Sequence, residues 1–193
     1  MRRICVFCGS NFGRRPVYRK SAEELGRWLA ERGLELVYGG GDVGLMGALA
    51  NAALSAGGCV IGVIPRRLSE REVAHLGVTE LRVVETMHER KALMVELSDA
   101  FVSLPGGLGT MDEFFETLTW AQLDIHRKPC GLLNTGGYYD QIVGLLDRFV
   151  EDGFLSPRNR ELIIVRESLD ELMTALMARE PIEAEQFFER DLS

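Results

Sequence analysis

Seven short apolar runs, rich in β-branched residues, alternate with segments of helical periodicity along this chain of 193 residues. The apolar runs lie at residues 4–8, 34–38, 59–64, 81–84, 100–104, 130–133 and 162–165. The helical segments lie at residues 17–32, 44–56, 89–97, 110–125, 139–149 and 169–177. Strands that alternate with helices in this way form a mainly parallel sheet with helices on both faces. The sequence therefore predicts an α/β protein with a Rossmann-like, doubly wound sheet.

The length of the chain favours a single domain. It falls within the roughly 100–200 residues usual for one domain, and it is long enough to bury a sizeable core. No linker, repeat or low-complexity stretch divides it. We expect one Rossmann-like domain over residues 1–180, followed by a polar tail over residues 181–193.

The charge balance argues against several classes of partner. The chain has 22 basic and 29 acidic residues, for a net charge of −7. Bulk nucleic-acid binding needs many Lys and Arg residues, although one local basic pocket could still hold a phosphate. No apolar run approaches the roughly 18 residues of a membrane span, and no cleavable apolar segment opens the chain. We expect a cytoplasmic protein without a nucleic-acid or membrane partner.

The cysteines and histidines do not form a recognisable metal or redox motif. Cys5 and Cys8 have C-x-x-C spacing, but they fall on a strand and its end, where buried, reduced thiols are expected. His75, His88 and His126 are scattered along the chain, without the spacing of metal ligands. We therefore expect no metal site and no cofactor.

Glycine clusters follow the expected strands. The chain has 21 glycines, bunched after the first strand, over residues 39–47 and over residues 106–109. A fourth segment, residues 87–91, opens the helix after the fourth strand. Because ligands of doubly wound sheets bind beyond the carboxyl ends of the strands, these four segments are expected to border the site.

The loop over residues 105–113 has the features of a phosphate cradle. Gly106, Gly107 and Gly109 allow the backbone to turn tightly, and the helix expected from Thr110 aims its positive end at the same point. The alternative is an ordinary strand-to-helix turn that uses glycine for its geometry. Glu113, in the first turn of this helix, could be a functional acid or only an acid placed favourably in the helix dipole.

The loop over residues 39–47 resembles a dinucleotide fingerprint only loosely. It contains G-x-G-x-x-G but follows the second strand, and residues 64–67 (Ile-Pro-Arg-Arg) stand where an acidic residue is expected.

Arg90 and Lys91 are adjacent on a helix and lie about 100° apart around it, so we expect one to reach a ligand and the other to pack or pair. A solvated charged face is the alternative. Ser10 has no histidine or acidic partner at motif spacing, so it is not interpreted as a nucleophile.

Taken together, these segments resemble the Lonely Guy (LOG) family of phosphoribohydrolases, many of which were formerly labelled lysine decarboxylases. The resemblance rests on Gly-Gly-Gly at 39–41 with Gly-Leu-Met-Gly at 44–47, Met-His-Glu-Arg-Lys at 87–91, and P-G-G-x-G-T-x-x-E at 105–113. It extends over about residues 2–176. It implies a Rossmann-like homodimer that hydrolyses the N-glycosidic bond of a nucleoside 5′-monophosphate, preferably an N6-modified adenosine monophosphate, to the free base and ribose 5-phosphate.

The resemblance also assigns residues. The catalytic pair falls on Arg90 and Glu113. Substrate contacts are expected at Ser10, Gly41, Glu72, Met87, Lys91, Gly106, Gly107, Leu108, Gly109, Thr110, Met111, Asp112 and Thr119. Asp112 departs from the family, in which many members carry Glu-Glu at the end of this motif. No lysine stands in a context that suggests a Schiff base with pyridoxal phosphate.

The chemistry agrees with this assignment. Cleavage of an N-glycosidic bond builds positive charge on the ribose, which a carboxylate can stabilise. Arginine is a poor proton donor, because its pKa exceeds about 12. Arg90 is therefore expected to have a positioning and electrostatic role. Two other functions stay open: an AMP nucleosidase of nucleotide salvage, and a non-catalytic nucleotide- or cofactor-binding module. A homodimer is also expected because the helix over residues 110–125 carries more apolar surface (Phe114, Phe115, Leu118, Trp120 and Leu123) than one sheet face would cover.

Overall fold

Seven parallel strands form one sheet in the computed structural model, which describes residues 1–69 and 73–182. The strands are β1 (Arg3–Phe7), β2 (Glu35–Tyr38), β3 (Val60–Pro65), β4 (Glu80–Val84), β5 (Ala100–Ser103), β6 (Cys130–Leu133) and β7 (Ile163–Arg166). Their order is β4-β3-β2-β1-β5-β6-β7, and every neighbouring pair is parallel. This order confirms the doubly wound α/β fold that the sequence predicts.

All six expected helices are present, with bounds that differ from the expectation by at most three residues. The helical elements are α1 (Pro16–Glu31), α2 (Gly44–Ser55), α3 (Arg66–Leu68), α4 (Met87–Leu97), α5 (Leu108–Gln122), η2 (Thr135–Gly137), α6 (Asp140–Glu151), α7 (Pro157–Arg160) and α8 (Leu169–Met177). The short elements α3, η2 and α7 were not expected, because segments of three or four residues are too short to show a helical period. Helix α5 begins two residues before the expected start, directly after Gly107, so Gly109 lies in its first turn.

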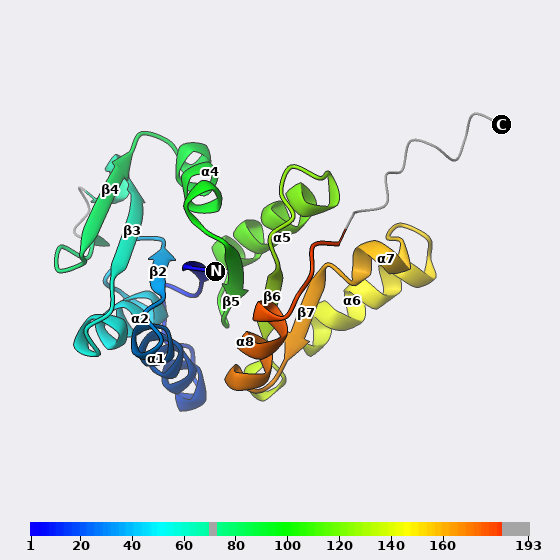
Figure 1. Cartoon of the computed structure of the whole chain (residues 1–193), viewed down its shortest axis with the longest axis horizontal. Coiled ribbons are helices and arrows are strands. Elements are labelled where there is room, and N and C mark those ends of the chain that lie inside the picture. The colour runs from blue at the N-terminus through cyan, green and yellow to red at the C-terminus, as the bar shows by residue number, and fades with distance from the viewer. Residues whose placement is uncertain (70–72, 183–193) are drawn as a thin grey trace.

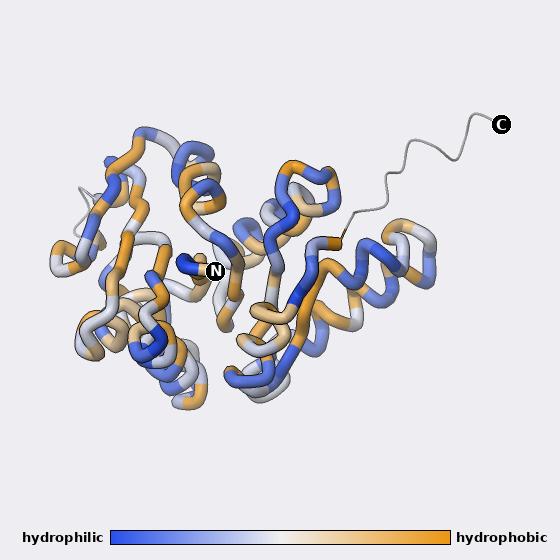
Figure 2. The backbone as a smooth tube through the Cα atoms, in the orientation of Figure 1, coloured by the Kyte–Doolittle hydropathy of each residue, from blue (hydrophilic) through white to orange (hydrophobic). Residues whose placement is uncertain are grey.

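The helices lie in two layers, one on each face of the sheet (Figure 1). Along β1, Ile4 and Val6 pack with residues of α1, α2 and α8, whereas Cys5 and Phe7 pack with α4. Such alternation is expected of a strand that is buried on both faces. Residues of α5 and α6 cover β6 and β7 on the same side as α4. Figure 2 shows the resulting hydrophobic bands along the strands and the mixed character of the outer helices.

The first four strands and the last three run outward from the middle of the sheet in opposite directions. The chain passes from β1 through β2 and β3 to β4, and then returns to place β5 on the free side of β1. This reversal opens a crevice between the carboxyl ends of β1 and β5, the usual ligand position in such folds. No helix in the described residues is long and apolar enough to cross a membrane. Of the expected tail, only residues 181 and 182 are among those described.

Candidate active site

The loops after β1 and β5 meet directly at this crevice. The Gly9 amide donates a hydrogen bond to the Pro105 carbonyl at 3.0 Å. A Cβ atom at Gly106 would lie 2.0 Å from Thr110 Oγ1 and 2.9 Å from the Gly9 nitrogen. Only glycine fits at position 106, because the two backbones and the Thr110 side chain occupy the space that a Cβ atom would need.

A pocket of about 380 Å³ lies at this point and gathers residues from the four segments that the sequence singled out. Eight of the expected site residues line it: Ser10, Gly41, Arg90, Gly107, Leu108, Gly109, Thr110 and Glu113. The rest of its wall is largely apolar and includes Val43, Met46, Ile64, Leu68 and Val73. Sequence reasoning missed these five residues, since single apolar side chains in an α/β chain look like core residues.

The charged centre of the pocket is a buried ion pair. Arg90 Nη2, from α4, donates a hydrogen bond to Glu113 Oε1, from α5, at 2.9 Å, and both side chains are about 10% exposed. Burial raises the pKa of Glu113, and the positive charge of Arg90 offsets only part of that rise. The Arg90 Nε atom is buried and has no hydrogen-bond partner among the described residues. Glu113 is therefore not a solvent-exposed acid that merely complements the helix dipole.

The β2–α2 loop makes room for this arginine. A Cβ atom at Gly39 would lie 2.0 Å from Arg90 Nη2, so a side chain there would displace the guanidinium group. The same loop is covered on its other side, where the Asp42 amide donates to the Val73 carbonyl and the His75 amide donates to the Gly40 carbonyl. The first of these bonds occupies a backbone amide that a dinucleotide fingerprint could present to a pyrophosphate, which argues against a dinucleotide site here.

The first amides of α5 are available to a ligand. Helix α5 begins after Gly107, and in the described part of the chain the amides of Gly107, Leu108, Gly109 and Thr110 donate no hydrogen bond to protein. Free amides at the start of a 15-residue helix form an anion-binding site, because the helix dipole adds a partial positive charge. This site and the Arg90–Glu113 pair border one pocket, so a bound phosphate and the carboxylate would face the same ligand.

Lys91 points away from the pocket. Its Nζ atom lies 3.1 Å from Asp112 Oδ2 and 3.0 Å from Glu116 Oε2, so it bridges α4 to α5. Burial lowers the pKa of Lys91, but its hydrogen bonds to Glu116 and Asp112 outweigh this effect and raise the pKa. Of the two adjacent bases, Arg90 lines the pocket and Lys91 pairs with carboxylates, so the substrate contact expected at Lys91 stays a prediction.

The remaining expected contacts lie outside the lining of this pocket. The Met87 sulfur accepts a 3.9 Å hydrogen bond from Arg90, and Gly106 lines a separate pocket together with Gly9 and Tyr138. Met111 packs against the apolar cluster of α5 and α6. Thr119 is exposed farther along α5 and donates to the Phe115 carbonyl at 2.7 Å. Glu72 falls outside the described residues, so its role, like those of the other contacts, stays a prediction.

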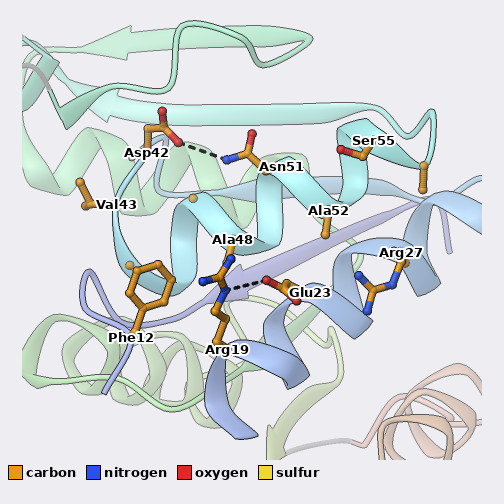
Figure 3. A pocket seen from close by; sticks show the side chains of 13 residues that line it. Phe12, Arg19, Glu23, Arg27, Asp42, Val43, Ala48, Asn51, Ala52 and Ser55 are labelled. Atoms are coloured by element: carbon orange, nitrogen blue, oxygen red, sulfur yellow. Dashed lines mark hydrogen bonds and ion pairs between the residues drawn. The ribbon is translucent and has the colours of Figure 1, made fainter. Parts of the chain in front are cut away.

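A larger pocket, of about 750 Å³, lies between α1 and α2 (Figure 3). Three of its charged groups are engaged with other residues of the lining: Arg19 pairs with Glu23 at 2.7 Å, and Asp42 accepts a hydrogen bond from Asn51 at 3.4 Å. The polar groups that line it do not include a buried acid like Glu113, whose side chain borders only the smaller pocket among those described. We therefore assign the chemistry to the pocket at the strand ends.

The cysteine thiols offer no competing chemistry. Cys5, Cys8 and Cys130 are buried and none of the four cysteines forms a disulfide. Burial raises the pKa of each of these three thiols. A thiol whose pKa is raised is a poor nucleophile at neutral pH. The described residues also contain no group of three or more His, Cys, Asp or Glu side chains that could hold a metal ion.

Comparison with known proteins gives one consistent result. A family model described as "Possible lysine decarboxylase" matches residues 46–176. The cytokinin riboside 5′-monophosphate phosphoribohydrolase LOG7 of Arabidopsis thaliana is 48% identical over 180 residues, which cover 93% of this chain and 83% of that protein. LOG3 of the same plant, with the same activity in its name, is 50% identical over 175 residues, covering 91% and 81%.

Solved structures share the fold at lower identity. The molybdenum cofactor carrier protein of Chlamydomonas reinhardtii is 22% identical, with a TM-score of 0.69, and the match covers 92% of this chain and 99% of that one. DNA processing protein A of Helicobacter pylori is 15% identical, with a TM-score of 0.55, over 91% of this chain and 80% of that one. At such identities the likeness concerns the fold alone.

Proposed function

This chain belongs to the Lonely Guy family of cytokinin riboside 5′-monophosphate phosphoribohydrolases, and from that membership we propose that it hydrolyses the N-glycosidic bond of N6-modified adenosine 5′-monophosphates. The products are the free base and ribose 5-phosphate. The observation that supports this most directly is the buried Arg90–Glu113 pair, which borders the same pocket as the free amides of α5.

The 5′-phosphate binds at the start of α5 in this proposal. The amides of Gly107, Leu108, Gly109 and Thr110 donate to its oxygens, and the helix dipole stabilises its charge. Binding energy gained at the phosphate then positions the ribose over the carboxylate, although the phosphate itself does not react. The apolar wall that includes Met46, Ile64 and Val73 receives the base and its N6 substituent.

Glu113 stabilises the transition state, and Arg90 positions the Glu113 carboxylate. As the bond to the base breaks, the ribose gains oxocarbenium character, and a carboxylate beside C1′ stabilises that charge and orients the attacking water. Arg90 holds the carboxylate at 2.9 Å and hydrogen-bonds the ribose hydroxyls. Arg90 does not supply the proton to the leaving base, because a guanidinium group stays protonated at neutral pH.

The decarboxylase description of the family finds no support in this site. A lysine that forms a Schiff base needs a depressed pKa and a free amine. No lysine lines the pocket among the described residues. Lys91, which follows Arg90, is held by two carboxylates and its pKa is raised. Burial lowers the pKa of Lys128, but its Nζ donates to the Val95 carbonyl at 2.7 Å.

The test of this function is chromatography of nucleotides after incubation with the protein. We expect free base and ribose 5-phosphate from N6-isopentenyl-AMP and from AMP, in the absence of any added cofactor. The ratio of kcat/KM for the two substrates distinguishes cytokinin activation from AMP salvage. Recovery of intact nucleotide, with binding retained, would identify a nucleotide-binding module instead.

We also propose that the protein is a cytoplasmic homodimer. Phe114 and Leu118 of α5 are buried within one chain, which removes them from the apolar surplus expected from the sequence. Leu108, Leu123 and Ile125 remain 90%, 59% and 62% exposed, and a second copy would cover them. Light scattering is expected to give twice the chain mass of 21.5 kDa, whereas a monomer at micromolar concentration would contradict the dimer.

A further inference from the structure

Three consecutive carbonyl groups lead into the phosphate-binding loop, and each accepts a hydrogen bond from a residue that is distant in the chain. Tyr139 Oη donates to the Leu104 carbonyl at 2.5 Å, and the Gly9 amide donates to the Pro105 carbonyl at 3.0 Å. Tyr138 Oη donates to the Gly106 carbonyl, also at 2.5 Å. The two tyrosines come from the connection between β6 and α6, which the sequence did not single out.

The hydrogen bond from Tyr138 fixes the orientation of the peptide group that joins Gly106 to Gly107. In a planar trans peptide the carbonyl and the following amide point in opposite directions. Because the Gly106 carbonyl points at Tyr138, the Gly107 amide points to the other side of the loop. Tyr138 and Gly106 line a separate pocket of about 290 Å³, whereas Gly107 also lines the pocket that contains Arg90 and Glu113.

Among the described residues, no other hydrogen bond is made to the carbonyl of Gly106 or by the amide of Gly107. Thr110 and Gly9 pack closely against Gly106, but a Cβ atom at Gly107 would have no neighbour within 4 Å, so packing does not restrain the Gly107 side of this peptide. Glycine also has the largest conformational freedom of any residue. The hydroxyl of Tyr138 therefore supplies the hydrogen bond that fixes the orientation of this peptide group.

Tyr138 is itself held for this contact. It follows η2, in which Gly136 and Gly137 have φ values of +60° and +73° and turn the chain back toward the loop. Its ring packs edge-on against Tyr18 at 5.4 Å and Tyr139 at 5.0 Å, measured between ring centroids. Since 39% of the residue is exposed, core packing does not explain why its hydroxyl group is placed against the Gly106 carbonyl.

We infer that Tyr138 is a positioning residue for the phosphate-binding loop, and that its hydroxyl turns the Gly107 amide toward the 5′-phosphate of the substrate. This inference rests on the proposed function, because it assumes that the pocket binds a nucleoside monophosphate. Tyr138 does not touch the substrate; it acts through the Gly106–Gly107 peptide.

The test compares Tyr138→Phe with the wild-type protein in phosphate binding. This variant keeps the ring and its contacts but removes the donor. We expect the dissociation constants of AMP and of inorganic phosphate, measured by calorimetry, and the KM for AMP to rise about three- to tenfold, the effect of one ordinary hydrogen bond. The value of kcat should stay within about twofold of wild type, and binding of adenosine, which has no phosphate, should not change.

Tyr18→Phe is the matched control. Tyr18 lines the same small pocket as Tyr138, but within the described part of the chain its hydroxyl accepts a hydrogen bond from Arg15, at 3.5 Å, and makes none to the loop. We expect this variant to bind phosphate like the wild type. Phosphate and AMP affinities that do not change in a folded Tyr138→Phe protein would overturn the inference, as would an equal loss of adenosine binding. A failure of the proposed function is distinguishable, because it would appear as absence of turnover by the wild-type protein, whatever the binding comparison gives.

Discussion

Arg90 Nη2 lies 2.9 Å from Glu113 Oε1, and this buried contact joins α4 to α5 at the strand ends of the sheet. The two residues are 23 positions apart in the chain. Each charge compensates the other in a place where an unpaired charge would be costly to bury. Because the pair also borders the pocket, it can act on a ligand as well as hold the two helices together.

Glu113→Gln tests the catalytic carboxylate. The change keeps the size and hydrogen-bonding capacity of the side chain and removes its charge. We expect kcat for AMP to fall by about 10²–10⁴, with a small change in KM, because the charge matters most in the transition state. Glu116→Gln, one turn farther along α5, is the control and should keep most of the activity. Near-wild-type kcat in folded Glu113→Gln would rule out this role for Glu113.

Arg90→Ala tests whether the pair acts as a unit. Loss of the guanidinium group should lower kcat and raise KM, because it releases the ribose and leaves Glu113 without its partner. We expect the double variant Arg90→Ala/Glu113→Gln to be much less impaired than the product of the two single losses, since residues that act together fail together. A double-mutant cycle in steady-state kinetics measures this coupling. Fully multiplicative losses would show that the residues work independently.

The pH dependence of activity should report Glu113. Burial raises the pKa of this carboxyl, and only its ionised form can stabilise a cationic ribose. Activity should therefore be present above the raised pKa and be lost as the pH falls through it. We expect the acidic limb of kcat/KM to lie above the ordinary glutamate pKa of about 4.3. An acidic limb at or below that value in the wild type would contradict the assignment.

Lys91→Met should move the acidic limb of the pH profile of kcat/KM to higher pH. The charge of Lys91 lowers the pKa of Glu113, whereas Asp112 and Glu116 raise it. Removing the bridging ammonium group leaves these two acids unopposed beside Glu113. Lys91→Arg, which keeps the charge, is the control and should shift the limb less. If Lys91 instead contacts the substrate phosphate, the KM for AMP will rise in Lys91→Met and the limb will stay in place.

Gly107→Ala and Gly106→Ala distinguish a glycine that contacts the ligand from one that the fold requires. A Cβ atom at Gly107 would meet no protein atom within 4 Å, so this change should leave the melting temperature nearly unchanged. It should raise the KM for AMP, because the methyl group would enter the space of the phosphate. Gly106→Ala should instead lower the melting temperature, since its Cβ atom would lie 2.0 Å from Thr110 Oγ1. An unchanged KM in Gly107→Ala would show that no ligand reaches this loop.

Much of the architecture could be predicted from the sequence, because the signals involved are local. The period of apolar residues and the glycines after each strand depend on neighbouring positions, and a buried parallel strand needs a continuous apolar run. These signals predicted all seven strands and the six longer helices. They also indicated that the loop beginning at Pro105 and the segment around Arg90 belong near the ligand.

The sequence by itself thus determined the sheet, the edge of the sheet where the site lies, and, through resemblance, the two residues at its centre. Only the tertiary structure decided what each side chain contacts. Arg90 and Lys91 are adjacent in the chain and about 100° apart around α4, and the packing of α4 on α5 places one beside Glu113 and the other beside Asp112 and Glu116. Likewise, Tyr138 reaches the Gly106 carbonyl, 32 positions away, because β5 and β6 are neighbours in the sheet. Local periodicity carries no information on such contacts, which depend on strand order and on how the helices pack across the sheet.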